Sequence, residues 1–159
     1  MQMVILRELL EGETVGGLPI REAITVNSGT VVRAAVARMR SMEIGCVLIV
    51  NTHGFPVGIF TERSLLDVLI QNASMDESAV GDFADDRCTV VKTSDPVSRV
   101  WDAVEREGQR FICVTDEAGK VVGLTGQRGL AEYISEYFPG EVMVQRIGGK
   151  PWMEQREGA

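Results

Sequence analysis

The chain has 159 residues, of which 45% are hydrophobic and 25% charged, a composition typical of a folded globular protein. Its formal net charge of −7 at pH 7 argues against nucleic acid and anionic membrane surfaces as partners, because both are bound by clustered lysines and arginines. The first residues lack the basic region of a signal peptide, and no apolar run approaches the roughly 20 residues that span a bilayer. We therefore expect a cytoplasmic protein with no nucleic-acid partner and no membrane partner.

The three cysteines are Cys46, Cys88 and Cys113. An odd count without CxxC spacing predicts neither a disulfide framework nor a zinc site. Cys46 and Cys113 fall within apolar, strand-like runs, so we expect them to be buried, reduced thiols, which suits the cytoplasm. His53 is the only histidine and cannot form a histidine metal site alone, so no metal site is predicted.

An internal repeat organises the chain. Residues 14–66 align without a gap on residues 79–131, at an offset of 65 positions. Matching positions share identical residues, among them Val15 and Val80, Val32 and Val97, and Gly58 and Gly123. One copy of about 55 residues is marginal alone, and two copies that pack their apolar sheet faces about a pseudo-two-fold axis would solve this burial problem.

In the first copy, a helical lead-in at residues 1–13 precedes a strand at 23–26. Thr30 is predicted to cap the helix that follows, because its hydroxyl can accept a free N–H of the first turn. A buried strand at 46–50, a turn that ends at Gly54 and a strand at 56–60 come next. A second helix is predicted from about Glu62.

The second copy has the same order of strand, helix, strand, strand and helix. Its strands are predicted at 89–92, 111–115 and 120–124, with a turn that ends at Gly119. Asp95 is predicted to cap the first helix, with Pro96 at the first helical position, where its missing N–H costs nothing. The second helix is predicted from about Gln127. The sequence thus predicts an α/β fold of two β-α-β-β-α repeats.

The C-terminal extension, residues 139–159, lies outside the repeat. Pro139 and Gly140 are predicted to stop the last helix. Residues 142–147 are compatible with a short edge strand. The rest is expected to be partly mobile, with Trp152 as an alternative docking residue.

The pattern TVVRAAVARM…GCVLIVNTHGFPVGIFTERSLL resembles a cystathionine-β-synthase-type (CBS) domain, and the second copy resembles one more distantly. The resemblance implies a tandem CBS-domain pair, or stand-alone Bateman module, with repeat 1 at residues 14–72 and repeat 2 at residues 79–138. It also implies a homodimer that regulates an unidentified protein. The ligands that it implies are adenosine-type: AMP, ADP, ATP or S-adenosylmethionine, bound in clefts between the copies.

One strand-to-helix corner occurs twice, as GIFTERSLL at 58–66 and as GLTGQRGLA at 123–131. Thr61 is predicted to cap its helix, where free N–H groups and the helix dipole favour an anion. The resemblance implies that the Thr position contacts phosphate and that an Asp three residues later contacts the ribose. This chain has Ser64 and Gly129 at the Asp positions and Gly126 at the second Thr position. We therefore expect a weakened first site and a second site that is not a standard nucleoside site.

Both copies keep an arginine in the first turn of this helix, Arg63 and Arg128. A cation there opposes the helix dipole, which suggests a use in binding a phosphate or carboxylate. A salt bridge, for instance from Arg63 to Glu62, or simple solvation is the alternative. Gly126 and Gly129 either allow close backbone packing or open the cleft for a bulkier ligand.

The resemblance also places Ile24 and Thr89 in the lining of the two clefts. Two functional hypotheses follow. The first is a ligand-sensing regulatory module, and the second is a structural or protein-interaction dimer with vestigial clefts. An enzyme is not predicted, because the sequence shows no nucleophile–base pair, no paired catalytic carboxylates and no P-loop.

Overall fold

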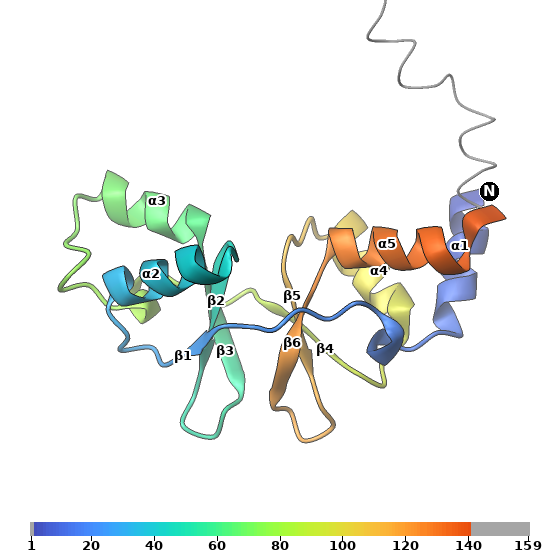
Figure 1. Cartoon of the computed structure of the whole chain (residues 1–159), viewed down its shortest axis with the longest axis horizontal. Helices are drawn as coiled ribbons and strands as arrows, with labels where there is room; N and C mark the ends of the chain where they lie inside the picture. Colours follow the sequence, from blue (N-terminus) through green and yellow to red (C-terminus); the bar gives the residue numbers. More distant parts are fainter. Residues whose placement is uncertain (1, 141–159) are drawn as a thin grey trace, which may run out of the picture.

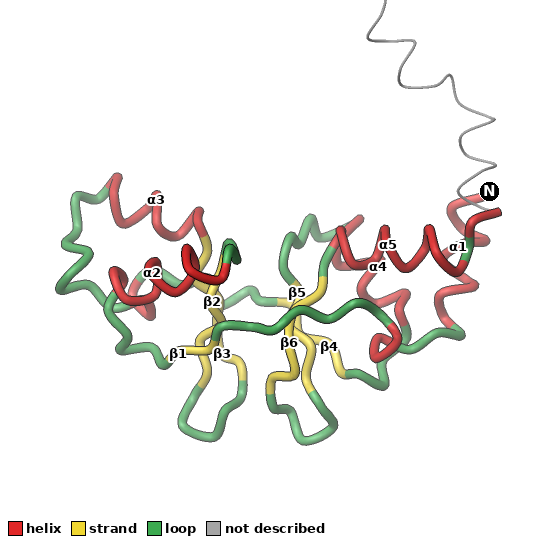
Figure 2. Tube along the Cα trace, viewed as in Figure 1, coloured by secondary structure: helices red, strands yellow, loops and turns green. Residues whose placement is uncertain are grey.

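The computed structural model describes residues 2–140, which form two similar halves with their sheets at the centre and their helices outside (Figure 1, Figure 2). Each sheet has three strands, the first parallel to the second and the third antiparallel to it. The strands are β1 (Thr25–Val26), β2 (Cys46–Val50) and β3 (Pro56–Thr61) in the first half, and β4 (Thr89–Lys92), β5 (Ile112–Thr115) and β6 (Val121–Thr125) in the second.

Two helices accompany each sheet, and one more precedes the repeat. The helices are α1 (Gln2–Glu11), α2 (Val32–Met42), α3 (Glu62–Ile70), α4 (Val97–Glu105) and α5 (Gln127–Tyr137). Short 3-10 turns at Val15–Gly17 and Val80–Asp82 open the two repeats. The predicted β-α-β-β-α order is confirmed in both halves. Every helix within residues 2–140 is too short or too polar to cross a membrane.

Two predicted helix caps are wrong. The N-cap of α2 is Val31, because the Thr30 hydroxyl turns back to Asn27 Oδ1 at 3.4 Å. The N-cap of α4 is Pro96, because the Asp95 carboxylate accepts the Lys92 N–H at 2.8 Å instead of an N–H of the helix. In both places a local turn competes with the helix end for the same polar side chain.

The first strand is also shorter than predicted, because the chain before it crosses to the other half. The backbones of Arg21 and Leu124, the latter in β6 of the second half, form two hydrogen bonds of 2.9 Å. The backbones of Asp85 and Ile59, the latter in β3 of the first half, form two more of the same length. Each sheet is therefore extended at its edge strand by one residue from the segment that precedes the other sheet, Arg21 at β6 and Asp85 at β3. A Cβ at Gly123 would collide with the Arg21 carbonyl, so this close approach explains a repeated glycine.

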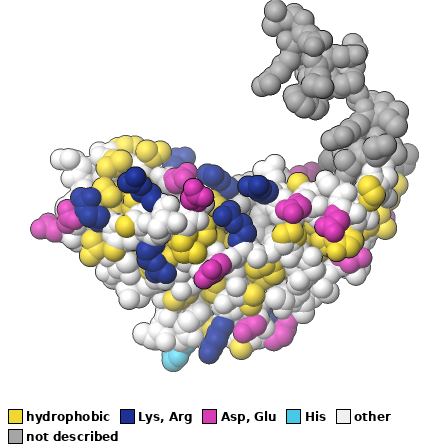
Figure 3. Space-filling view, in the orientation of Figure 1, with side chains coloured by type: hydrophobic (Ala, Val, Ile, Leu, Met, Phe, Trp, Pro, Cys, Tyr) yellow, Lys and Arg dark blue, Asp and Glu magenta, His cyan; other side chains and the backbone are white. Residues whose placement is uncertain are grey.

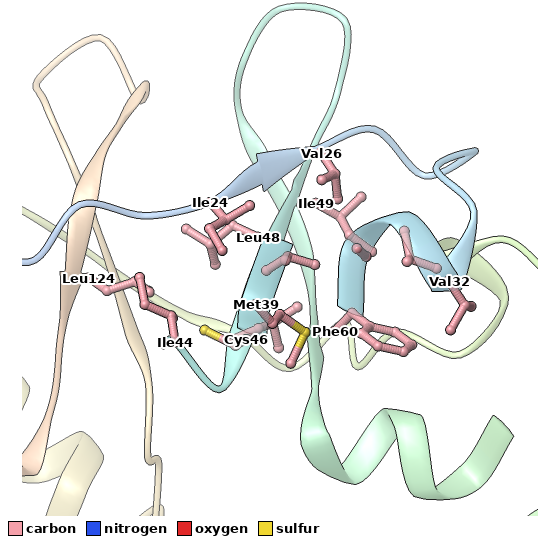
Figure 4. Close-up of a cluster of buried hydrophobic side chains, with 14 of the residues drawn as sticks. Ile24, Val26, Val32, Met39, Ile44, Cys46, Leu48, Ile49, Phe60 and Leu124 are labelled. Carbon is pink, nitrogen blue, oxygen red and sulfur yellow. The ribbon is translucent and has the colours of Figure 1, made fainter. Parts of the chain in front are cut away.

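The core of the first half extends across the junction (Figure 4). Ile24, Leu48 and Phe60 lie in one buried cluster that also contains Leu124 and Cys113 of the second half. Removing a side chain such as Phe60 from such a cluster costs about 3–5 kcal/mol. The predicted packing of the two copies against each other is thus present in the structure.

The second half has its own core, to which α1 contributes. Leu6 and Leu10 of α1 pack into the cluster that contains Ile134 of α5. Arg7 fixes α1 further by donating two hydrogen bonds, of 2.9 and 2.6 Å, to the Asp102 carboxylate on α4. The hydrogen bond from Arg7 lowers the pKa of Asp102, so the pair is fully charged at neutral pH.

Cys46 and Cys113 are buried and not disulfide-bonded, as predicted. Their burial raises the pKa of each thiol to about 12. Gly54 and Gly119 adopt positive φ angles of 82° and 87°, as the predicted turns require. The predicted strand at 142–147 and the docking residue Trp152 lie outside the described residues.

Candidate functional site

The two strand-to-helix corners each line a cavity between the halves. The repeat-one cavity, of about 810 Å³, is lined by Thr61, Arg63 and Ser64, among others. The repeat-two cavity, of about 730 Å³, is lined by the counterparts Gly126, Arg128 and Gly129, among others. Both volumes lie in the range of small-molecule sites. Figure 3 shows Lys and Arg side chains gathered near the middle of one face, over the junction of the halves.

At the repeat-one corner, the side chains of Thr61 and Ser64 form hydrogen bonds with the backbone N–H groups at the start of α3. The Thr61 hydroxyl accepts the Ser64 N–H at 3.3 Å, and the Ser64 hydroxyl accepts the Thr61 N–H at 3.0 Å. This capping box confirms Thr61 as the N-cap of α3. Because both hydroxyl oxygens serve the backbone and Ser64 is only 4% exposed, this corner offers little free hydrogen-bonding capacity to a ligand.

The repeat-two corner is open by comparison. Gly126 is the N-cap of α5 and has no side chain, so no side-chain cap accepts an N–H of the first turn. Thr125, the last residue of β6, is only 7% exposed and lines the cavity. Its hydroxyl makes no hydrogen bond to the residues that the structure describes.

Sequence reasoning missed Thr125, although a signal was present. Thr125 aligns with Phe60, which fills the core of the first half, and Thr61 aligns with Gly126. The second copy therefore has its threonine one position earlier than the first copy. At that position the side chain does not cap the helix and lines the cavity instead.

The distances around the two glycines favour close packing as their explanation. A Cβ at Gly126 would lie 2.5 Å from the Arg110 carbonyl oxygen. A Cβ at Gly129 would lie 2.9 Å from the Thr125 hydroxyl and 3.1 Å from the Pro19 carbonyl oxygen. The Thr125 hydroxyl thus lies against the space that a side chain at position 129 would need.

The two cavities differ in charge. Three arginines line each, but the acidic side chains that accompany them are unequal. The repeat-one cavity is lined by Arg63, Arg87 and Arg110 with Glu62, Asp67, Asp85 and Asp86, and the repeat-two cavity by Arg21, Arg110 and Arg128 with Glu132 alone. The lining charge is therefore −1 in the first and +2 in the second. The lining charge favours an anion in the repeat-two cavity, whereas the sequence predicts a weakened first site and a second site that is not a standard nucleoside site.

Arg63 and Arg128 lie on separate cavities, and neither makes an ion pair among residues 2–140. The alternative of a bridge between Arg63 and Glu62 is not found, because Glu62 pairs with Arg110 at 3.6 Å. The Arg110 guanidinium also lies 5.0 Å from the centre of the Phe111 ring, a cation–π contact. Arg110 and Phe111 line both cavities and form the wall that they share.

The remaining predicted site residues lie apart from the cavities. Ile24 is fully buried in the first core, and the Thr89 hydroxyl donates to Glu107 at 3.3 Å. Neither is among the residues that line the two cavities, so their implied role in binding has no support from this geometry. The part of the chain that the structure describes contains no group of three His, Cys, Asp or Glu residues suited to a metal ion.

These features define a tandem pair of β-α-β-β-α repeats that cross over each other and enclose one cavity per repeat. The family model for the CBS domain matches residues 15–71 and again residues 80–136, and the chain therefore belongs to the CBS-domain family. Over 133 residues the chain is 28% identical to the uncharacterized protein MK0525 of Methanopyrus kandleri, a match that covers 83% of this chain. It spans only 63% of that relative's length.

Solved CBS structures share the fold. The CBS domain pair of protein MJ0100, in complex with 5′-methylthioadenosine and S-adenosyl-L-methionine, superposes with a TM-score of 0.67 at 20% identity, over 77% of this chain and 96% of that one. The CBS domain protein PAE2072 from Pyrobaculum aerophilum, complexed with AMP, gives 0.66 at 18% identity, over 77% and 98%. A CBS domain-containing protein from Bacillus anthracis gives 0.69 at 14% identity, over 82% and 99%.

Proposed function

We propose that this chain is a regulatory ligand-sensing module that binds an adenosine-type nucleotide or a related anion in the repeat-two cavity. One observation carries the proposal: the uncapped N-terminus of α5 opens into a cavity lined by three arginines and a single glutamate. Free N–H groups and the positive end of a helix dipole bind phosphate readily. That solved relatives contain AMP or S-adenosyl-L-methionine supports the adenosine class.

The rest of the cavity wall suits the base of such a ligand. Ile44, Phe111 and Leu124 add apolar surface to the same lining. A nucleotide would thus place its phosphate at the start of α5 and its ring against these side chains. Since Ile44 comes from the first half and α5 from the second, the ligand would contact both halves.

Contact with both halves provides a mechanism of regulation. A ligand that binds better to one arrangement of the halves than to another shifts the population toward that arrangement. We propose that a partner protein responds to this shift. We further propose that the role is binding rather than catalysis, because the described part of the chain places no cysteine, no histidine and only one carboxylate in the lining of the repeat-two cavity.

A homodimer is also proposed, through α3. Leu66, Leu69 and Ile70 on this helix are 54%, 55% and 79% exposed. Their counterparts on α5 lie in the half that α1 covers, where Ile134, the counterpart of Leu69, is buried. A second copy that packs against α3 would remove a comparable apolar surface from water.

Thermal unfolding with AMP, ADP, ATP, S-adenosylmethionine and phosphate tests the ligand proposal. A ligand at about 100 times its dissociation constant adds about 2.7 kcal/mol of stability. For a chain of this size, that raises the midpoint by about 5–11 °C. Arg128→Ala should reduce the shift, and Arg63→Ala, the matched change at the other corner, should not.

The other outcomes are equally informative. A shift that is lost only in Arg63→Ala would move the site to the repeat-one cavity. No shift with any of these compounds would refute the proposal and leave the alternative of an interaction dimer with vestigial clefts.

A further inference from the structure

Building on the proposed function, we propose that the repeat-two cavity recognises its ligand by the anionic group and not by the ribose diol. It should therefore accept ribonucleotides and deoxyribonucleotides alike. The inference concerns which part of the ligand is recognised, and it follows from the hydrogen-bonding character of the groups that line the cavity.

Donors dominate the corner where α5 begins. The first N–H groups of α5 have no side-chain cap, and Arg128 lies within this first turn. Arg21, in the crossover segment, and Arg110, two residues before β5, line the same cavity. Arginines and free N–H groups are donors only, so they pair with anionic oxygens and cannot accept from a sugar hydroxyl.

Thr125 adds an independent observation. Its hydroxyl is buried at the cavity wall, lies against Gly129 and has no partner among the described residues. A buried hydroxyl without a partner is unfavourable, and an anion that accepts from it would relieve this cost. Its counterpart Phe60 has no hydroxyl and lies in the core of the first half. The unpartnered hydroxyl is therefore specific to the second corner.

Acceptors for a diol are correspondingly few. A carboxylate holds two adjacent hydroxyls best, because it accepts from both. Gly129 has no side chain, and the Thr125 hydroxyl lies only 2.9 Å from where a Cβ at this position would be. Among residues 2–140, Glu132 is the one carboxylate in the lining; it is exposed and lies one turn further along α5. The acceptors nearest to position 129 are the Thr125 hydroxyl oxygen and the Pro19 carbonyl oxygen, 2.9 and 3.1 Å from the place of a Cβ there, and both are neutral.

Calorimetric titration of the full chain with AMP, 2′-deoxy-AMP and adenosine tests the inference. The two nucleotides should bind within about twofold of each other, and adenosine at least tenfold more weakly, because it lacks the charge-assisted hydrogen bonds. Thr125→Val should weaken both nucleotides by a similar factor of about three to ten. Thr61→Val is the matched control and should leave both affinities unchanged.

The possible outcomes separate this inference from the proposed function. Tenfold or greater preference for AMP over 2′-deoxy-AMP would overturn the inference while the proposed function stands. If that preference then disappears in Glu132→Gln, Glu132 is the diol acceptor. If neither AMP, ADP, ATP nor inorganic phosphate binds, the inference and the proposed function both fail.

Discussion

Thr61 and Thr125 occupy neighbouring positions of the two corners, so the same substitution at each should change stability in opposite directions. The Thr61 hydroxyl accepts the Ser64 N–H at the start of α3, and replacing an N-cap threonine costs about 1 kcal/mol. Thr125 has a buried hydroxyl without a partner, which costs the folded state about 1–3 kcal/mol. Valine has nearly the same shape as threonine and lacks the hydroxyl.

For Thr125→Val, part of this gain is offset by packing. The new methyl group is larger than the hydroxyl that it replaces and would pack beside Gly129, near the place where a side chain at position 129 would begin. We expect a net gain of about 1 kcal/mol, which raises the midpoint by about 2–4 °C at this chain length. Thr61→Val should lower it by a similar amount.

Urea unfolding followed by circular dichroism, with no ligand present, measures both changes in the free energy of unfolding. The sign of the difference is decisive. If Thr125→Val destabilises the protein as much as Thr61→Val, its hydroxyl has a partner in the folded chain. The case for a free donor at the repeat-two corner would then be lost.

Three further predictions concern ion pairing, thiols and assembly. Asp102→Asn should lower the stability at pH 7, and the deficit should shrink below about pH 4 in urea titrations, because a carboxylate with a lowered pKa stabilises only while it is ionised. Cys46 and Cys113 should resist Ellman's reagent at pH 8 until the protein unfolds, because both are buried with a pKa of about 12. Sedimentation should give twice the 17.4 kDa of one chain, and Ile70→Glu on α3 should shift it to one chain, while Val122→Glu, at an exposed apolar residue away from α3, should not.

The order and the positions of the elements could be predicted because the chain repeats them. Apolar periodicity marks β2 and β5 as buried strands, and the two turn glycines fall where the antiparallel hairpins need positive φ. Where one copy is ambiguous, the other constrains it. The helix caps were harder to predict, because a local turn competes with the helix end for the same polar side chain. Thr30 and Asp95 are typical helix caps in the sequence but form turn contacts in the structure.

The relative strength of the two sites was harder to predict, because it depends on residues from the opposite half. Each cavity takes part of its wall from a crossover segment, 19–21 for the repeat-two cavity and 83–87 for the repeat-one cavity. Arg21 contributes to one and the acidic pair Asp85 and Asp86 to the other. A comparison of the corners alone does not include these charges, and it therefore favours the corner whose cavity has the more negative lining.

Arg110 shows how one difference between the two copies affects both cavities. Its counterpart in the first copy is Gly45, so the guanidinium has no symmetric partner. It adds positive charge to the repeat-two cavity and, by pairing with Glu62, neutralises part of the acidic wall of the other. An anion in the repeat-two cavity would compete with Glu62 for this guanidinium, and Glu62 would then make the repeat-one cavity still less favourable for a second anion. The acidic residues set the difference in charge between the two cavities, and through the shared Arg110 an anion bound in one cavity would weaken the other for a second anion.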